Sequence, residues 1–81
     1  MTDRPPISQE ELRKLLVLKT VRLRMLKVAY NRTLSVADAK VLVSDANEKL
    51  LSGISPWRPD PAHPVEEQID AFIIHVAFII R

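Results

Sequence analysis

The placement of glycine and proline restricts the fold of this chain more than any other feature of its sequence. Gly53 is the only glycine, and the six prolines stand at positions 5, 6, 56, 59, 61 and 64. Sheet proteins with several tight turns usually need more glycine, because such turns use backbone angles that glycine adopts most easily. The stretches 7–52 and 65–81 contain neither residue. We therefore predict an all-α fold.

Length and composition indicate one domain. The chain has 81 residues, of which 47% are apolar and only 5% aromatic. Because a chain this short buries only about 60% of its unfolded surface, a second core is not expected. We predict a flexible N-terminal arm over 1–7 and a single helical domain over 8–81. Its expected elements are helices at about 9–32, 36–52 and 65–80 and a proline-rich loop at 54–64.

Serines mark the starts of the first two predicted helices. Ser8 precedes Glu11 by three residues, which is the capping-box spacing, and Ser35 precedes Asp38 by the same interval. Gly53 is expected to end the second helix in the left-handed conformation. Pro64 suits the first position of the third helix, whose acidic opening turns favour the positive end of the helix dipole.

The first predicted helix carries two apolar faces. At about 100° per residue, one side gathers Leu12, Leu15, Leu16, Leu23, Leu26 and Tyr30, and the nearly opposite side gathers Val17, Leu18, Val21, Met25, Val28 and Ala29. The second helix has a single stripe, formed by Val36, Ala39, Leu42, Val43, Ala46 and Leu50. One neighbouring helix cannot cover both faces of the first. We therefore predict a three-helix bundle-like unit whose core is completed by homodimerisation.

The C-terminal segment allows two interpretations. As a helix, it presents a wide apolar face made of Val65, Ile69, Phe72, Ile73, Val76, Ile79 and Ile80, with Ile74 and Phe78 on the other side. As an alternative, 72–80 is a strand, because the residues from Ala71 to Ile74 recur from Ala77 to Ile80. A six-residue repeat keeps one face of a strand but not of a helix. Such a strand would pair across a dimer.

The sequence lacks the residue patterns of common catalytic and metal sites. A single glycine cannot build a phosphate-cradling loop, and the absence of cysteine removes disulfides, thiolate catalysis and cysteine metal ligands. The histidines are His63 and His75, and no acidic residue or histidine lies three or four positions from His75. We therefore place His75 at the edge of the core or in an interface, and we expect no enzyme activity, cofactor or metal.

Charge is distributed unevenly along the chain. Residues 1–32 hold eight Lys and Arg against three Asp and Glu, whereas the rest hold four against seven. A basic front and an acidic back suggest an anionic partner for the front or a head-to-tail contact between subunits. If the partner is a nucleic acid, Arg13, Arg24 and Lys27 are the candidate phosphate contacts.

The expected location is the cytoplasm, and no membrane partner is expected. The first eleven residues are polar, unlike a signal peptide, and the apolar stretch 71–80 is shorter than the roughly 20 residues of a membrane-spanning helix.

We predict a small non-catalytic protein–protein interaction module, an adaptor or regulator, that works as a homo-oligomer, expected to be a dimer, and binds another protein. A nucleic-acid-binding protein that uses the basic first helix is the alternative. The predicted partner-binding residues are Val17, Val21, Met25, Val28, Trp57, Ile74 and Phe78. Trp57 allows a second interpretation, in which its indole packs on the helices and fixes the proline-rich loop.

Overall fold

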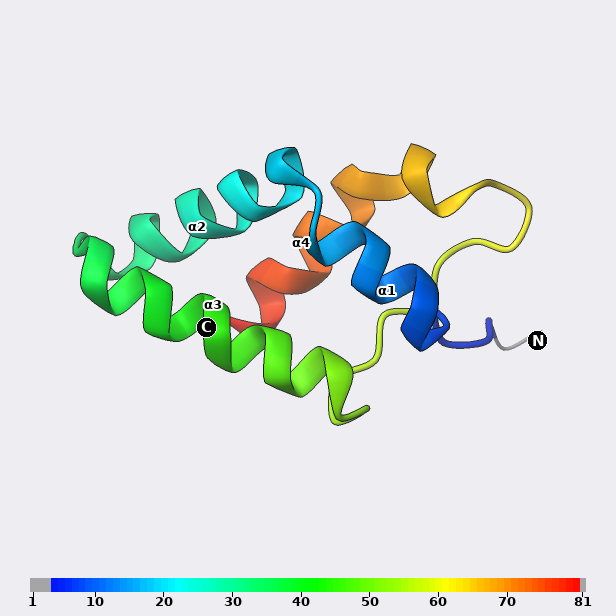
Figure 1. Cartoon of the computed structure of the whole chain (residues 1–81), viewed down its shortest axis with the longest axis horizontal. Helices are drawn as coiled ribbons and strands as arrows, with labels where there is room; N and C mark the ends of the chain where they lie inside the picture. The colour runs from blue at the N-terminus through cyan, green and yellow to red at the C-terminus, as the bar shows by residue number, and fades with distance from the viewer. Residues whose placement is uncertain (1–3, 81) are drawn as a thin grey trace.

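The computed structural model describes residues 4–80, which contain helices and no strand. The elements are α1 (Gln9–Leu16), α2 (Lys19–Thr33), α3 (Val36–Leu51), the 3-10 turn η1 (Val65–Gln68) and α4 (Ile69–Ile79). The helices α2 and α3 lie side by side, joined by a tight turn, and α4 packs against both (Figure 1). The all-α prediction is confirmed, and the strand alternative for 72–80 is wrong.

The predicted helix over 9–32 is wrong in one respect, because it is two helices. Val17 closes α1, and Leu18 has an extended backbone with φ −68° and ψ 129° before α2 begins. The chain therefore has four α-helices within 4–80 and not three.

The break turns the two apolar faces of the predicted helix toward one core. Leu12 and Leu15 from one face are buried together with Val21, Met25 and Ala29 from the other. Burying a side chain such as leucine or valine stabilises a fold by about 1.5–3 kcal/mol, whereas a helical hydrogen bond contributes about 0.5–1.5 kcal/mol. The gain from burying both faces thus exceeds the cost of interrupting the helix.

The turn between α2 and α3 uses one unusual backbone conformation. Leu34 adopts a left-handed conformation with φ 55° and ψ 24°, and its N–H donates to the Tyr30 carbonyl at 2.7 Å. Ser35 then caps α3 by accepting from the Asp38 N–H, as predicted, and Ser8 caps α1 through the Glu11 N–H. Gly53, with φ 81°, follows the end of α3 as predicted.

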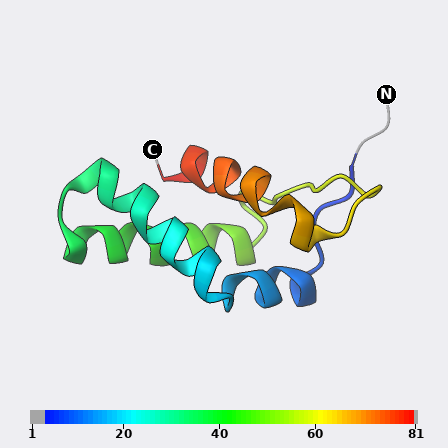
Figure 2. The same ribbon diagram turned by 90° about the horizontal axis from the view of Figure 1, so that it is seen from above.

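The C-terminal helix closes the core from one side, and from above it lies on the opposite side of α3 from α1 (Figure 2). Phe72 and Val76 are fully buried. The indole of Trp57 meets the Phe72 ring edge-on at a centroid distance of 5.0 Å. This contact anchors the proline-rich loop on the helices.

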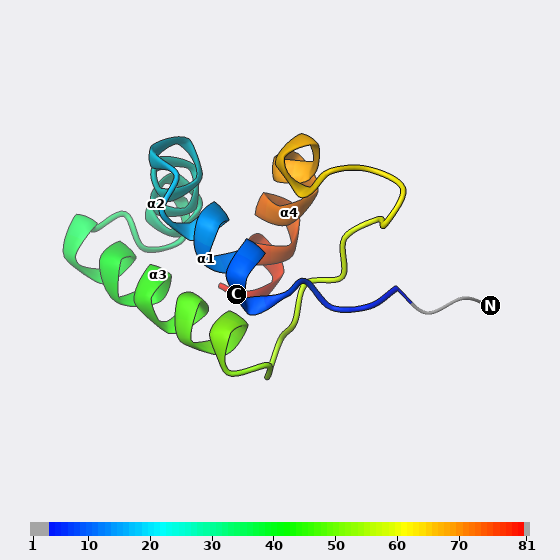
Figure 3. The same ribbon diagram turned by 45° about the vertical axis from the view of Figure 1, so that its right-hand side comes forward.

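The described part of the predicted arm, residues 4–7, lies beside that loop (Figure 3). The Ile7 N–H donates to the Trp57 carbonyl at 2.9 Å, and the Arg58 guanidinium donates to the Arg4 carbonyl at 2.7 Å. Residues 1–3 of the predicted arm lie outside the described residues.

Candidate functional site

A groove of about 640 Å³ runs between α2 and α3 on the surface. It is lined by Leu16, Lys19, Arg22, Leu23, Met25, Leu26, Lys40, Val43, Ser44 and Asn47. The lining positions recur every three or four residues along each helix, so each helix contributes one face. The floor is apolar, and three cations border it.

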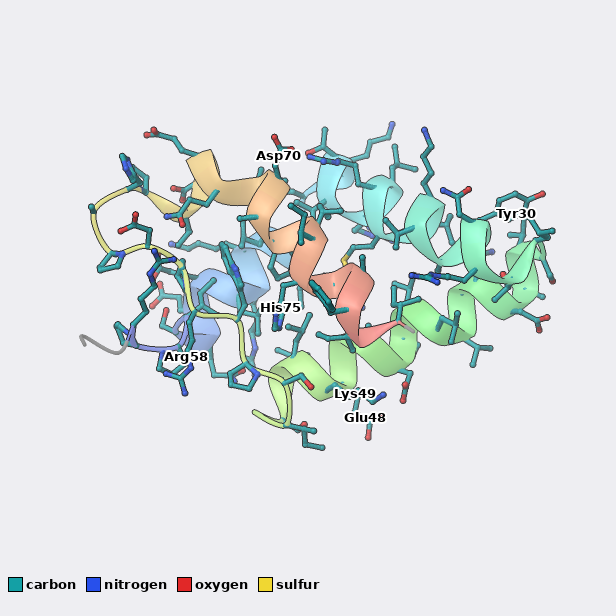
Figure 4. All side chains as sticks on the ribbon, turned by 180° about the vertical axis from the view of Figure 1, so that it is seen from behind. Tyr30, Glu48, Lys49, Arg58, Asp70 and His75 are labelled. Atoms are coloured by element: carbon teal, nitrogen blue, oxygen red, sulfur yellow. The ribbon has the colours of Figure 1, made fainter. Side chains whose placement is uncertain are left out.

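A smaller hollow of about 320 Å³ extends the groove toward the turn between the two helices. It is lined by Leu23, Leu26, Lys27, Tyr30 and Val36, and it shares Leu23 and Leu26 with the larger hollow. Tyr30 lies near the turn, at the far end of α2 from α1 (Figure 4). We call the two hollows together the α2/α3 groove.

The charges that line the α2/α3 groove are all positive. Lys19, Arg22, Lys27 and Lys40 contribute cations, and no Asp or Glu lines either hollow in the described chain. Asn47 is one of the lining residues, and its Oδ1 is buried without a hydrogen-bond partner among the described residues. A ligand for this groove would offer apolar groups to its floor and carboxylates to its rim.

A second surface with a distinct pattern lies on the outer side of α4 and η1. Its exposed positions are Glu67, Asp70, Ala71, Ile74 and Phe78, spaced by three or four residues. Ile74 and Phe78 are each 61% exposed. We call these five residues the α4 ridge, which is acidic where it begins and apolar where it ends.

The predicted partner-binding residues divide between surface and core. Val17, Ile74 and Phe78 are on the surface. Val28 is half-buried against the core. Val21, Met25 and Trp57 are buried within one copy, although Met25 also lines the α2/α3 groove. The break at Leu18 explains why Val21 and Met25 are buried, and the contact with Phe72 explains why Trp57 is buried.

The three candidate phosphate contacts have three different surroundings. Arg13 is on α1, and Lys27 borders the smaller hollow. The guanidinium of Arg24 donates to the Asp70 carboxylate at 2.6 Å, which links α2 to the start of α4 (Figure 4). The fold therefore does not give the three residues a common environment.

The remaining polar groups tie loops to helices. The Gln68 amide donates to the carbonyls of Asp60 and His63 at 2.9 and 3.0 Å and accepts from the Asp60 N–H at 2.8 Å. The Nε2 of His75 lies 3.0 Å from the Ser55 carbonyl, so this half-buried ring sits at the core edge, as predicted. Within 4–80, no polar or charged residue is buried, and no group of three His, Asp or Glu could hold a metal.

Sequence reasoning missed the groove although it identified most of its apolar lining. Leu16, Leu23, Leu26 and Tyr30 belong to one predicted face of the first helix. The available signal was the cations at Lys19, Arg22 and Lys27, which lie beside that face at helical spacing.

Comparisons with known proteins returned no relative for this chain: no family model, curated protein or solved structure matches it. Among the described residues, no helix combines the length and the apolar character needed to span a membrane.

Proposed function

We propose that this chain is a non-catalytic protein–protein interaction module that binds an amphipathic helix in the α2/α3 groove. The observation that carries the proposal is the groove itself, whose apolar floor lies between four cations. Amphipathic helices commonly bind in such grooves through apolar side chains three, four and seven residues apart.

The magnitudes of the two kinds of contact assign them different roles. An apolar anchor of leucine size contributes about 1.5–3 kcal/mol when fully buried, whereas an exposed ion pair contributes about 0–1 kcal/mol. The floor would therefore supply most of the affinity. The cations would select helices that carry carboxylates beside their apolar stripe and disfavour basic ones.

Homo-oligomerisation belongs to the same proposal, but its surfaces differ from those that the sequence indicated. The second apolar face of the predicted first helix supports a dimer less than the sequence indicated, because Val21 and Ala29 are buried in one copy and only Val17 and Leu18 of that face are largely exposed. The exposed apolar groups that support association are those of the groove and the α4 ridge. A cytoplasmic site of action stays a prediction, supported by the absence of cysteine.

Two designed helical peptides test the proposal. Both carry the same leucine stripe, flanked by glutamates in one and by lysines in the other. The glutamate peptide should bind the full chain and shift the NMR signals of Leu26 and Val43. Leu23→Glu should abolish this binding, because it places a carboxylate on the groove floor.

Val41→Glu is the matched control, since Val41 is an exposed α3 residue that does not line the groove. It should bind the glutamate peptide as well as wild type does. Equal binding of both peptides, or none, would contradict the proposal. Steeply salt-dependent binding of duplex DNA without peptide binding would favour the nucleic-acid alternative.

A further inference from the structure

We propose that the helix bound in the α2/α3 groove is the α4 ridge of a second copy of this chain, in a head-to-tail contact. The inference rests on the proposed function, because it uses the same groove and names its occupant. It adds that self-association occupies the groove and so limits the access of other helices to it.

The α4 ridge has the composition that the groove selects. Ile74 and Phe78 lie four residues apart on one exposed side of α4, as the anchors of a groove-bound helix do. Ala71, one turn before them, is small enough to allow close approach of the backbone. The part of the ridge from Ala71 to Phe78 is therefore an apolar stripe on a regular helix.

The charges of ridge and groove are complementary. Glu67 and Asp70 lie on the ridge and Glu66 lies beside it, whereas all the charged groups that line the groove are cations. Asp70 binds Arg24 of its own copy, yet its side chain is still 87% exposed. Its carboxylate can thus face a second copy while keeping this ion pair.

A single copy cannot place its own ridge in its own groove. Phe72 and Val76 hold α4 in the core, whereas α1, α2 and α3 alone supply the groove lining. The contact must therefore form between copies, and it is heterologous because it joins two different surfaces. Each pair retains one unoccupied groove and one unoccupied ridge, so association continues into chains or closes into a ring.

The expected contact is weak. Only two large apolar side chains stand on the ridge, and interfaces that bury less than about 1,200 Å² in total are typical of transient complexes. Self-association should therefore depend on concentration. A helix that binds the groove more tightly would displace α4 and dissolve the assembly, which couples partner binding to oligomeric state.

Two variants that each remove one surface test the inference by complementation. Leu23→Glu disables the groove and leaves the ridge, and Ile74→Glu disables the ridge and leaves the groove. Both positions are exposed, so neither substitution should unfold the chain. Far-UV circular dichroism and the emission of Trp57 check that each variant keeps the wild-type fold. Sedimentation velocity should show wild-type mass rising with concentration, whereas each variant alone stays monomeric.

An equimolar mixture of the two variants should form a species of two chains that does not grow further. It would join the intact groove of Ile74→Glu to the intact ridge of Leu23→Glu. Val41→Glu is the control and should associate like wild type. The inference is overturned if wild type stays monomeric, if either variant associates like wild type, or if the mixture stays monomeric.

The glutamate peptide separates this inference from the proposed function. Ile74→Glu should still bind that peptide, and the peptide should dissociate wild-type assemblies. Peptide binding by a wild-type protein that stays monomeric would refute only the head-to-tail contact. Loss of both peptide binding and self-association would refute both proposals.

Discussion

Leu15 and Val21 are buried in the same core, although a continuous helix would place them roughly 120° apart around its axis. The extended backbone of Leu18 brings them together, since it separates α1 from α2. This relationship explains why one copy can bury so much of its first segment, and it determines which apolar residues are left for partners.

The break at Leu18 can be tested with proline. Lys19 is the first residue of α2, and its predecessor already has the extended backbone that a residue before proline prefers. Lys19→Pro should keep the free energy of unfolding within about 1 kcal/mol of wild type, because the first helical position tolerates proline. In an unbroken helix the substitution would cost about 3 kcal/mol or more.

Arg22→Pro is the matched control for the same urea titration. Its N–H donates to the Leu18 carbonyl at 3.0 Å, so proline there removes a hydrogen bond of α2. We expect a loss of about 3 kcal/mol. Equal losses for the two variants would contradict the break.

Leu34 offers a stabilising substitution. Its left-handed backbone costs a leucine about 1–2 kcal/mol, and its side chain is 75% exposed. Leu34→Gly should raise the free energy of unfolding by about 1 kcal/mol, because glycine adopts φ 55° without a steric penalty. Leu34→Ala keeps the strained backbone and should give no such gain in thermal unfolding.

The two phenylalanines of α4 should respond differently to truncation. Phe72 is fully buried against Trp57, so Phe72→Ala should cost about 3–5 kcal/mol. Phe78 is mostly exposed, and Phe78→Ala should cost less than about 1 kcal/mol. Denaturation followed by the emission of Trp57 measures both, with Phe72→Leu as a milder variant. Similar costs would contradict the difference in burial between the two rings.

Gln68 should be important for the order of the proline-rich loop. Gln68→Glu keeps the acceptor for the Asp60 N–H but replaces the amide donor by an oxygen that faces two carbonyls. We expect a loss of about 1–3 kcal/mol and faster hydrogen exchange at the Asp60 amide. Gln9→Glu, which removes one exposed hydrogen bond to the Leu51 carbonyl, should cost less. No change in exchange at Asp60 would contradict this role.

Most of the fold could be predicted from the sequence, because the local capping signals and the pattern of apolar residues agree along most of the chain. The Ser8 and Ser35 caps, the glycine after α3 and the apolar face of α4 were all predicted from spacing alone. The break at Leu18 was not predicted, because it involves neither glycine nor proline. The break has a tertiary cause, because turning both apolar faces inward stabilises the fold only where those faces pack against α3 and α4.

The same tertiary effect misdirected part of the site prediction. We interpreted the two faces of the first segment as a need for a second copy, and so we assigned Val21 and Met25 to an interface. Ile74 and Phe78 were placed correctly on the exposed side of α4, because that helix is regular. The groove was missed because it depends on how α2 and α3 pair, which spacing along one helix does not reveal.

In the head-to-tail contact that we propose, the groove of one copy binds the α4 ridge of another. A dilution series of the wild-type chain, monitored by two-dimensional NMR, tests this contact without any substitution. Signals of Leu26 and Val43 should shift together with those of Ile74 and Phe78, along one common concentration dependence. Spectra that do not change with concentration, or shifts confined to only one of the two surfaces, would contradict it.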